Sequence, residues 1–451
     1  MSKADQNQSS QGFQGYSLPI SGTENPELTH IERGTRCGEY LRRYWHPVAM
    51  SSELGELPMN VEILAEELVL FRDKSGRLGL LHRHCSHRGA SLEYGIVAEQ
   101  GIICCYHGWH YDIDGRLLCA GSEPADGPLC QQITHGAYPT HEHNGIIFAY
   151  LGPADEKPEF PVFDTELIGD IEAIPFSITT PCNWLQVYEN TQDPIHVLHL
   201  HSRSSGVQFG VASGVDQETD YKTTPIGMIN VQSRRVGDNL WVRSTESILP
   251  NVNQTGAIFE EADEEKYFQR SAILRWMVPV NNVVTRTIGW RFFSQSMDPN
   301  NLGDRGQVGK EKIDFIGQTE EERPYEERQR QPGDYEAQVS QRQIAVHGLE
   351  HHGTSDAGVV RIRHLLRRAM RELESSGKCY AYTVGADQAI ATYIQDSVTP
   401  WPTDDSGLTE QEKLRIYGKL VSDAVLNSAE LNATQRQGHI REVCKNIQSS
   451  E

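Results

Sequence analysis

Cys85-Ser86-His87, followed by Arg88-Gly89, and Cys104-Cys105-Tyr106-His107, followed by Gly108-Trp109, are the most informative stretches of the chain. Sixteen residues separate His87 from Cys104, so the pattern reads C-x-H, a gap and C-x-x-H. Each motif offers one thiolate and one imidazole, and the flanking glycines allow the backbone to turn tightly. The pattern predicts two loops that hold one metal centre between them.

The order of the ligands distinguishes two kinds of metal centre. A structural zinc site also uses two cysteines and two histidines, but it usually pairs Cys with Cys and His with His along the chain. Here each loop pairs a cysteine with a histidine, which suits a 2Fe-2S cluster with both cysteines on one iron and both histidines on the other. We therefore predict a Rieske-type cluster whose ligands are Cys85, His87, Cys104 and His107.

Three similar side chains near the motifs are not predicted to be ligands. Cys105 would give C-x-H spacing with His107, so Cys104 fits the second motif better. His84 and His110 are interpreted as residues around the cluster or at the surface.

A second group of histidines follows Asp193 in the stretch Asp193-Pro194-Ile195-His196-Val197-Leu198-His199-Leu200-His201. Two histidines and one carboxylate form the facial triad that holds Fe(II) and leaves positions open for O2 and substrate. Because Pro194 breaks or kinks a helix, helical phase cannot be carried through it. His196 is the first ligand; His199 then has the better spacing on one helical face, whereas His201 requires the helix to end or bend. The residues alone leave His199 and His201 as alternatives.

Composition limits the possible partners. The chain has 451 residues and a formal net charge of -21, which argues against nucleic acid and anionic membranes. It has no apolar run of about 18 residues, so no membrane span is expected. The polar start lacks the features of a signal peptide, and clustered cysteines in a reducing compartment suit metal binding. We expect a cytoplasmic protein.

The pattern along the chain predicts a tail and two domains. We expect a polar N-terminal tail at 1–34, a mostly β-stranded cluster domain at 35–155 and a second domain at 156–451. Asp114-Gly115 predicts a tight hairpin in the cluster domain, and three prolines between 153 and 161 predict a linker. In the second domain, apolar residues at helical spacing after Asp356 predict a helix.

With both motifs in place, the chain resembles the alpha subunit of the Rieske aromatic-ring-hydroxylating oxygenases, in particular the group that contains phthalate dioxygenase and dehydrodivanillate O-demethylase. Further stretches that carry this resemblance are Leu41-Arg42-Arg43-Tyr44-Trp45-His46-Pro47-Val48, Asp334-Tyr335-Glu336-Ala337-Gln338-Val339-Ser340 and Glu350-His351-His352-Gly353-Thr354-Ser355-Asp356. The resemblance runs roughly from Glu32 to Leu373 and departs from the family pattern between Gln341 and Leu349. It implies an α+β fold, with an antiparallel β Rieske domain and a catalytic domain of the helix-grip type, whose antiparallel sheet is flanked by helices.

The resemblance also implies roles for single residues. The family pattern D-x-x-H-x-x-x-x-H implies His196 and His201 as iron ligands, with Asp193 as the bridge that receives electrons from a neighbouring subunit's cluster. It implies Asp334 as the third ligand; the alternative interpretation of Asp334 is an acid at a helix N-terminus. Asp193 is alternatively a helix cap before the following proline. Arg203 is a candidate for binding a substrate carboxylate, and its alternative interpretation is a solvent-facing cation.

The activity implied is that of a terminal oxygenase with a 2Fe-2S cluster and a mononuclear Fe(II). It would use O2, and electrons from NAD(P)H delivered by a separate reductase with or without a ferredoxin. The implied substrate is an aromatic, carboxylated molecule, oxidised by ring hydroxylation, dihydroxylation or O-demethylation. The implied assembly is a homotrimer or a dimer of trimers. The alternative function is a Rieske electron-transfer protein without oxygenase activity. The chain contains neither G-x-G-x-x-G after a strand nor C-x4-C-x2-C, so no reductase or ferredoxin is expected to be fused to it.

Overall fold

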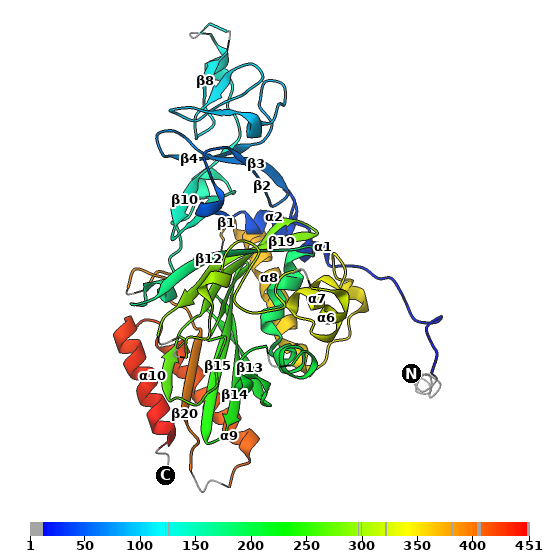
Figure 1. Cartoon of the computed structure of the whole chain (residues 1–451), viewed down its shortest axis with the longest axis vertical. Helices are drawn as coiled ribbons and strands as arrows, with labels where there is room; N and C mark the ends of the chain where they lie inside the picture. Colours follow the sequence, from blue (N-terminus) through cyan, green and yellow to red (C-terminus); the bar gives the residue numbers. More distant parts are fainter. Residues whose placement is uncertain are drawn as a thin grey trace.

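The structure is a computed structural model, and it describes residues 12–448 except 122, 125–126, 207, 296, 299, 321–322, 380–381, 386 and 404–406. Figure 1 shows two parts. Short strands form the upper part, and a large sheet accompanied by helices forms the lower part. Among the described residues, no helix is both long enough and apolar enough to cross a membrane.

The upper part contains two antiparallel sheets of four strands each. One has the order β2 (Met59–Ile63), β3 (Glu66–Arg72), β4 (Leu78–His82) and β9 (Ala137–Tyr138). The other has the order β5 (Ile96–Val97), β6 (Ile102–Ile103), β7 (Trp109–Tyr111) and β8 (Leu117–Ala120), and the short helix α3 (Leu129–Gln132) contacts β8. The predicted turn at Asp114-Gly115 joins β7 to β8, and Gly115 has a positive φ of 81° there.

A three-stranded sheet joins the two parts. It consists of β1 (Trp45–Met50), β11 (Ile146–Tyr150) and β10 (Thr140–His143) in that order. The ring of Phe148 in β11 lies 5.3 Å from that of Trp276 in the large sheet. The indole N–H of Trp290 donates to the carbonyl oxygen of Asn144 at 2.8 Å. One hydrophobic core therefore continues from this sheet into the lower part.

The large sheet has nine antiparallel strands. Seven follow the order β12 (Glu172–Thr180), β19 (Val284–Phe293), β18 (Ile273–Asn281), β16 (Val252–Thr255), β15 (Asn239–Ile248), β14 (Gly227–Val236) and β13 (Glu218–Thr224). Off this path, β20 (Gln395–Pro400) pairs with β15 and with β17 (Lys266–Gln269). Long, buried strands of this kind present side chains alternately to the two faces.

Helices lie against the large sheet and at its margins. They are α4 (Trp184–Glu189), α5 (Pro194–Leu198), α6 (Tyr325–Arg330), α7 (Asp334–Val339), α8 (Ala357–Ser376), α9 (Glu410–Asn427) and α10 (Ala433–Gln448). In α8 the predicted stripe is buried at Ile362, Leu366 and Met370, and the helix ends at Gly377 with a positive φ of 67°. In α9, Gly418 lies against the side chain of Ser233 in β14. Since side chains alternate, Gln232 and Arg234 lie on the opposite face of this strand from α9.

The predicted α+β fold of antiparallel sheets and helices is confirmed. The prediction that residues 1–34 form a polar tail is wrong for residues 25–34; residues 1–11 of that prediction lie outside the described residues. A short helix, α1 (Pro26–Thr29), precedes α2 (Arg36–Leu41), and Leu28 and Ile31 are fully buried. The Leu28 carbonyl accepts the indole N–H of Trp184 at 3.0 Å. The few apolar residues of this segment pack on helices that are distant in the sequence. The residues around them are mostly polar, so the sequence pattern did not indicate this packing.

Candidate metal centres and substrate cavity

Two loops of the upper part bring the four predicted cluster ligands together. Cys85 and His87 follow β4, and the loop from Cys104 to His107 connects β6 to β7. Both cysteines are buried in the core of this part, whereas both histidines are exposed. The centroids of the two imidazole rings lie 4.5 Å apart. The thiols therefore lie on the inner side of the candidate site and the imidazoles at the surface.

Backbone hydrogen bonds close both loops. The N–H of Gly89 donates to the Cys85 carbonyl at 2.9 Å, and the N–H of Gly108 donates to the Cys104 carbonyl at 3.1 Å. Gly89 and Gly108 have φ angles of 76° and 72°, a region that side chains disfavour. The two glycines therefore make the tight turns that the motifs predict.

The donor chemistry of these loops fits a 2Fe-2S cluster with two thiolate and two imidazole ligands. Burial raises the pKa of Cys104, which favours the protonated thiol in the absence of metal. Because a thiol must be deprotonated to bind metal, Cys104 releases a proton when the cluster binds. The hydroxyl of Tyr111 lies 3.2 Å from Sγ of Cys85. The ring of His87 stacks on Trp109 at a centroid distance of 4.7 Å. The sequence analysis did not identify these two aromatic contacts. The only feature of the sequence that could have indicated them is that Trp109 and Tyr111 follow the second motif directly.

The neighbouring side chains lie where the sequence suggested. Cys105 is exposed, in contrast to Cys85 and Cys104, which are buried. His84 is exposed and its Nδ1 contacts the Gly89 carbonyl oxygen at 3.0 Å. His110 is half-buried and its Nε2 contacts the Gln100 carbonyl oxygen.

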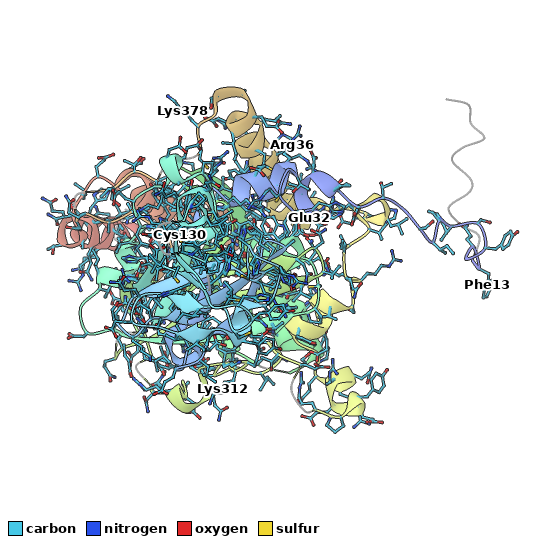
Figure 2. The ribbon with its side chains drawn as sticks, turned by 90° about the horizontal axis from the view of Figure 1, so that it is seen from above. Phe13, Glu32, Arg36, Cys130, Lys312 and Lys378 are labelled. Carbon is cyan, nitrogen blue, oxygen red and sulfur yellow. The ribbon has the colours of Figure 1, made fainter. Side chains whose placement is uncertain are left out.

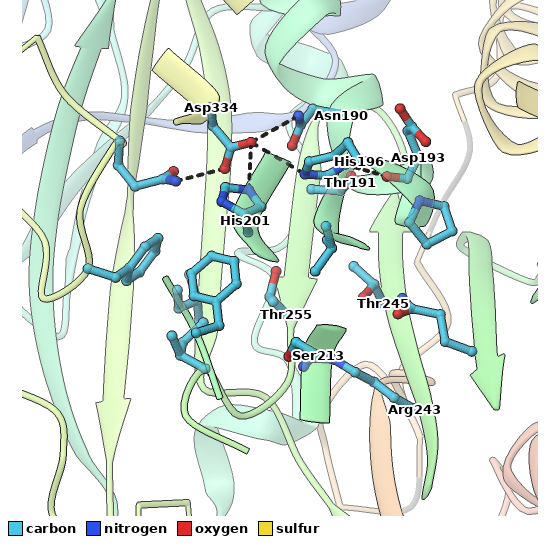
Figure 3. A pocket seen from close by; sticks show the side chains of 18 of the residues that line it. Asn190, Thr191, Asp193, His196, His201, Ser213, Arg243, Thr245, Thr255 and Asp334 are labelled. Carbon is cyan, nitrogen blue, oxygen red and sulfur yellow. Dashed lines mark hydrogen bonds and ion pairs between the residues drawn. The ribbon is translucent and has the colours of Figure 1, made fainter. Parts of the chain in front are cut away.

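The second candidate metal centre lies beside the large sheet. His196 of α5, His201 and Asp334 of α7 each offer one ligand atom, and these atoms all lie within 4.8 Å of one another. Oδ1 of Asp334 lies 3.3 Å from Nε2 of His196 and 3.1 Å from Nε2 of His201. Figure 3 shows the three side chains pointing toward one another. The structure thus brings together the three residues that the resemblance implied.

The local helix geometry explains the spacing of the two histidines. After Leu198, α5 continues as a π-helical segment, His199–Ser204. A π-helix has a wider turn than an α-helix, with hydrogen bonds from residue i+5 to residue i. The N–H of Ser205 donates to the Leu200 carbonyl at 3.2 Å in this way. As a result His201 is buried on the side of His196, whereas His199 is exposed.

Other side chains orient the three candidate iron ligands. Gln208 Oε1 lies 2.6 Å from Nδ1 of His201, and the Asp193 carbonyl oxygen contacts Nδ1 of His196. The Gln318 amide donates to Oδ2 of Asp334 at 2.7 Å. These contacts occupy Nδ1 of both rings and leave Nε2 for a metal, the arrangement that metal-binding histidines use.

The carboxyl group of Asp334 is ionised at this centre. Burial would raise the pKa of Asp334, but the imidazoles of His201 and His196 hold it well below its usual range. Burial would lower the pKa of His196, but the Asp334 carboxylate raises it. Asp334 is therefore an anion surrounded by two ring nitrogens, which fits the donor set of a ferrous facial triad.

Asp193 lies between two cavities. Asp193 lines the cavity beside the triad, and it also lines a second cavity at the surface. Gln341, Leu349 and His351 are among the other residues that line the second cavity. The side chain of Asp193 does not cap α5, so the alternative interpretation as a helix cap is not supported. In Figure 3 its carboxylate lies beside His196 and points away from the cavity interior.

The cavity beside the triad has apolar and charged walls. Apolar side chains from six residues line it, namely Pro194, Val197, Phe209, Ile258, Ile273 and Phe315. Arg234, Arg243 and Arg275 also line it, although sequence reasoning did not single them out. Arg203, the arginine that it did single out, is not among the lining residues. The Arg203 side chain is 52% exposed and its Nη2 lies 2.8 Å from Oδ1 of Asp216, so the interpretation as a surface cation holds.

Comparisons with known proteins agree with these sites. The Rieske [2Fe-2S] domain family matches residues 44–131, which include all four predicted cluster ligands. The chain is 42% identical to the tert-butanol monooxygenase / tert-amyl alcohol desaturase oxygenase subunit of Aquincola tertiaricarbonis, over 100% of this chain and 98% of the relative. It is 34% identical to the phenoxybenzoate dioxygenase subunit alpha of Ectopseudomonas oleovorans, over 79% of this chain and 87% of the relative.

Other relatives include oxygenase subunits named phthalate 4,5-dioxygenase, from Pseudomonas putida, and 5,5'-dehydrodivanillate O-demethylase, from Sphingobium, each 32% identical. They confirm the group that the resemblance indicated. A solved structure of NdmA from Pseudomonas putida CBB5, a mutant with caffeine, has the same fold, with a TM-score of 0.52 and 18% identity over 78% of this chain and 94% of that chain.

The comparisons confirm the predicted cluster type, the mononuclear non-heme iron and the oxygenase class, and they do not support the alternative of an electron carrier without oxygenase activity. These relatives are named as subunits of their enzymes, two of them as oxygenase subunits. With a relative 42% identical along its whole length, the chain belongs to the Rieske non-heme iron oxygenases, as a terminal oxygenase subunit.

Proposed function

We propose that His196, His201 and Asp334 hold one ferrous ion, at which the chain oxidises a small organic substrate with O2. The observation that carries this proposal is that ligand atoms of all three residues lie within 4.8 Å of one another beside a cavity. Ferrous iron held by such a triad reacts with O2 and keeps positions open for substrate.

The protein's own residues hold this centre in place. Gln208 and the Asp193 carbonyl fix the two imidazoles, and Gln318 fixes Asp334. Such contacts around metal ligands set both their orientation and their affinity for metal. The apolar walls of the cavity limit the access of water to the bound substrate.

We further propose that Cys85, His87, Cys104 and His107 hold the cluster, which receives electrons one at a time from the reductase. The exposure of His87 and His107 supports this role, because a donor protein can approach that side of the cluster closely. We propose NAD(P)H as the source of the electrons, a reductase with or without a ferredoxin, and a cytoplasmic location.

The route from cluster to iron is proposed to cross between copies of the chain. In Figure 1 the sheets that carry the cluster loops extend away from the large sheet. Asp193, in contrast, lines both the cavity beside the triad and the cavity at the surface of the lower part. The cluster of a neighbouring copy, docked on that surface, would reach the iron through Asp193. We therefore propose a homotrimer or a dimer of trimers.

The substrate is proposed to have a flat apolar body, such as an aromatic ring. Phe209, Phe315 and Ile258 form the apolar walls that support this. The names of the relatives include aromatic and non-aromatic compounds. Two relatives are named for phenoxybenzoate and phthalate, which are aromatic, and one is named for tertiary alcohols, which are not. Analysis of the products formed with O2 and a surrogate reductase distinguishes ring hydroxylation from O-demethylation.

Metal analysis of the purified protein tests the proposed function. Two irons in the cluster and one in the triad give about three irons per chain. About two irons with an intact cluster spectrum would contradict the proposed iron centre. Zinc without iron-sulfur absorption would contradict both assignments.

A further inference from the structure

The cavity beside the triad is small for an aromatic substrate. In the structure it has a volume of about 80 Å³. By comparison, an apolar protein cavity that holds one benzene molecule has a volume of about 150 Å³. A wall of the cavity must therefore move before an aromatic molecule can bind beside the iron ligands.

Phe315 lies where this cavity meets a larger one. It lines the cavity beside the triad, and it also lines an outer cavity with a volume of about 560 Å³. Phe315 is 8% exposed, and its ring packs edge-on against that of Phe209 at a centroid distance of 5.6 Å. The ring of Phe315 is therefore a wall shared by a small cavity and a large one.

The outer cavity combines buried apolar residues with exposed polar ones. Ile313 and Tyr335 line it together with Phe315 and are buried, whereas Lys312 and Glu320 line it and are exposed. Figure 2 shows Lys312 at the edge of the molecule. A cavity of this kind can receive a flat apolar molecule from solvent, and its volume is large enough for an aromatic ring.

The backbone on both sides of Phe315 is held in place. Oδ2 of Asp314 lies 3.1 Å from Nη2 of Arg291 in β19, and these two side chains are 0% and 2% exposed. On the other side, the Gly317 carbonyl accepts the N–H of Tyr335 in α7 at 2.9 Å. A phenyl ring forms no such bonds, so rotation of the Phe315 side chain breaks packing contacts only. The movable element is therefore the ring and not the chain that carries it.

The surface cavity beside Asp193 is a less suitable entrance. Asn190 and Asp193 line both that cavity and the cavity beside the triad. The Asn190 amide donates to Oδ1 of Asp334 at 3.3 Å, and the Asp193 carbonyl oxygen contacts Nδ1 of His196. Moving either residue would disturb a contact of a proposed iron ligand. In the proposed assembly, a neighbouring copy also covers this surface.

We propose, on the basis of the proposed function, that substrate enters through the outer cavity and that Phe315 is the gate between the two cavities. When its ring turns aside, the cavities join and an aromatic molecule can pass to the iron ligands. When the ring returns, it separates the bound molecule from solvent. Phe315 is a specificity-determining residue, because the size of its side chain limits the size of the molecules that pass. Substrate and electrons then arrive from different sides, past Phe315 and Asp193.

Stopped-flow fluorescence of the iron-loaded protein, without O2 or reductase, tests the proposal. The probes are 2-naphthol and 2-naphthoate, a neutral and an anionic aromatic molecule. The association rate constant of wild type is expected to lie well below the diffusion limit of about 10⁸–10⁹ M⁻¹ s⁻¹. Phe315→Ala should raise the association and dissociation rates by about tenfold or more, and Phe315→Trp should lower both. Because a gate affects entry and exit alike, the dissociation constant should change less than either rate.

Two tryptophan variants compare the two possible entrances. Gln307 is exposed and lines the outer cavity, and Leu349 is half-buried and lines the surface cavity beside Asp193. Gln307→Trp should slow association by about threefold or more, whereas Leu349→Trp, the matched control, should leave it unchanged. The reverse result would show that substrate enters beside Asp193, and it would overturn the proposal.

The iron content, the cluster absorption and the thermal midpoint of each variant are measured on the same samples, so that misfolding is recognised. If Phe315→Ala does not fold, Phe315→Leu, which keeps an apolar side chain, provides the result. Wild-type rates in the folded Phe315 variants, with three irons per chain, refute the gate alone. If neither probe binds to wild type with three irons, the aromatic substrate and the gate are refuted together. Two irons per chain refute the proposed iron centre, whatever the rates show.

Discussion

Oδ1 of Asp334 lies 3.1 Å from Nε2 of His201, although 133 positions separate the two residues in the sequence. His201 belongs to the π-helical segment after α5, and Asp334 is the first residue of α7. Between these elements the chain forms seven strands of the large sheet. The candidate iron centre therefore depends on the tertiary fold. Single substitutions of its side chains test which residues bind the metal.

Asp334→Ala is expected to remove the mononuclear iron and to spare the cluster. Alanine deletes the only anionic ligand of the proposed triad, while the cluster loops lie in the other part of the molecule. The iron content should fall from about three to about two per chain, with an unchanged cluster spectrum. Asp216→Ala, a change of an exposed aspartate, is the matched control and should keep all the iron. Full iron and turnover in Asp334→Ala would place the third ligand elsewhere.

A pair of histidine variants tests the choice that the sequence left open. His201→Ala should lose the mononuclear iron, because the His201 ring is buried against Asp334. His199→Ala should keep both the iron and the turnover, because His199 is exposed. Iron analysis of the two purified variants, together with wild type, measures the difference. The opposite result would show that the helix forms a different turn when iron binds.

The cluster site could be predicted almost completely from the sequence, and the iron site only in part. The four proposed cluster ligands lie within two short loops, so their spacing along the chain reflects their spacing in space. The choice of His201 over His199 depends on a π-helical segment, and the α-helical period favours His199, which the structure leaves exposed. Resemblance to a known family was needed for this choice and for Asp334, since no local pattern links a residue so distant in the sequence.

The substrate cavity could not be predicted. Arg234, Arg243 and Arg275 lie in three strands, and only strand pairing shows that they line the same cavity. Arg203 follows the histidines closely in sequence, but its side chain pairs with Asp216 at the surface. Sequence proximity to a metal ligand is a weak guide to position when the chain turns away within a few residues.

Asp193→Asn is expected to keep both metals and to slow electron transfer between them. The asparagine keeps the size of the side chain, and the backbone carbonyl that contacts His196 is unchanged. The variant removes the negative charge between the surface cavity and the triad. Stopped-flow absorption of the reduced cluster, mixed with O2 and substrate, measures the rate of reoxidation. Asp356→Asn, a change of a residue that lines only the surface cavity, is the control. Equal rates in wild type and Asp193→Asn would exclude the proposed bridge.

Arg363→Met is expected to lower the free energy of unfolding by about 3–5 kcal/mol, since it leaves a buried carboxylate without its cation. Arg363 of α8 donates to both carboxylate oxygens of Glu189 at 2.7 and 2.6 Å, and the two side chains are 5% and 9% exposed. Adding Glu189→Gln should restore part of the loss. Arg203→Met breaks an exposed pair and should cost about 1 kcal/mol or less. Urea unfolding of the four proteins gives these values, and equal losses for the two arginines would contradict the importance of the buried pair.

His46 is expected to make the folded chain less stable in mild acid. It is fully buried, its Nε2–H donates to the Leu41 carbonyl at 2.7 Å, and burial lowers its pKa from 6.5 to about 4. Between these two pKa values the unfolded chain binds a proton that the folded chain does not. The contribution of neutral His46 is therefore complete above about pH 6.5 and declines as the pH falls toward 4, by about 2 kcal/mol at pH 5.

His46→Gln isolates this contribution, because the glutamine amide can donate to the Leu41 carbonyl but does not titrate. The free energy of unfolding is measured at pH 7.5 and pH 5.0 for wild type and variant. Carboxylates that titrate in this range affect both proteins alike, so their contribution cancels when the two losses are compared. The loss of stability on acidification should be smaller in the variant by about 2 kcal/mol. Equal losses in the two proteins would mean that the imidazole becomes protonated inside the fold, and that Leu41 and Asn251, which contacts Nδ1 at 3.3 Å, rearrange to accept the charge.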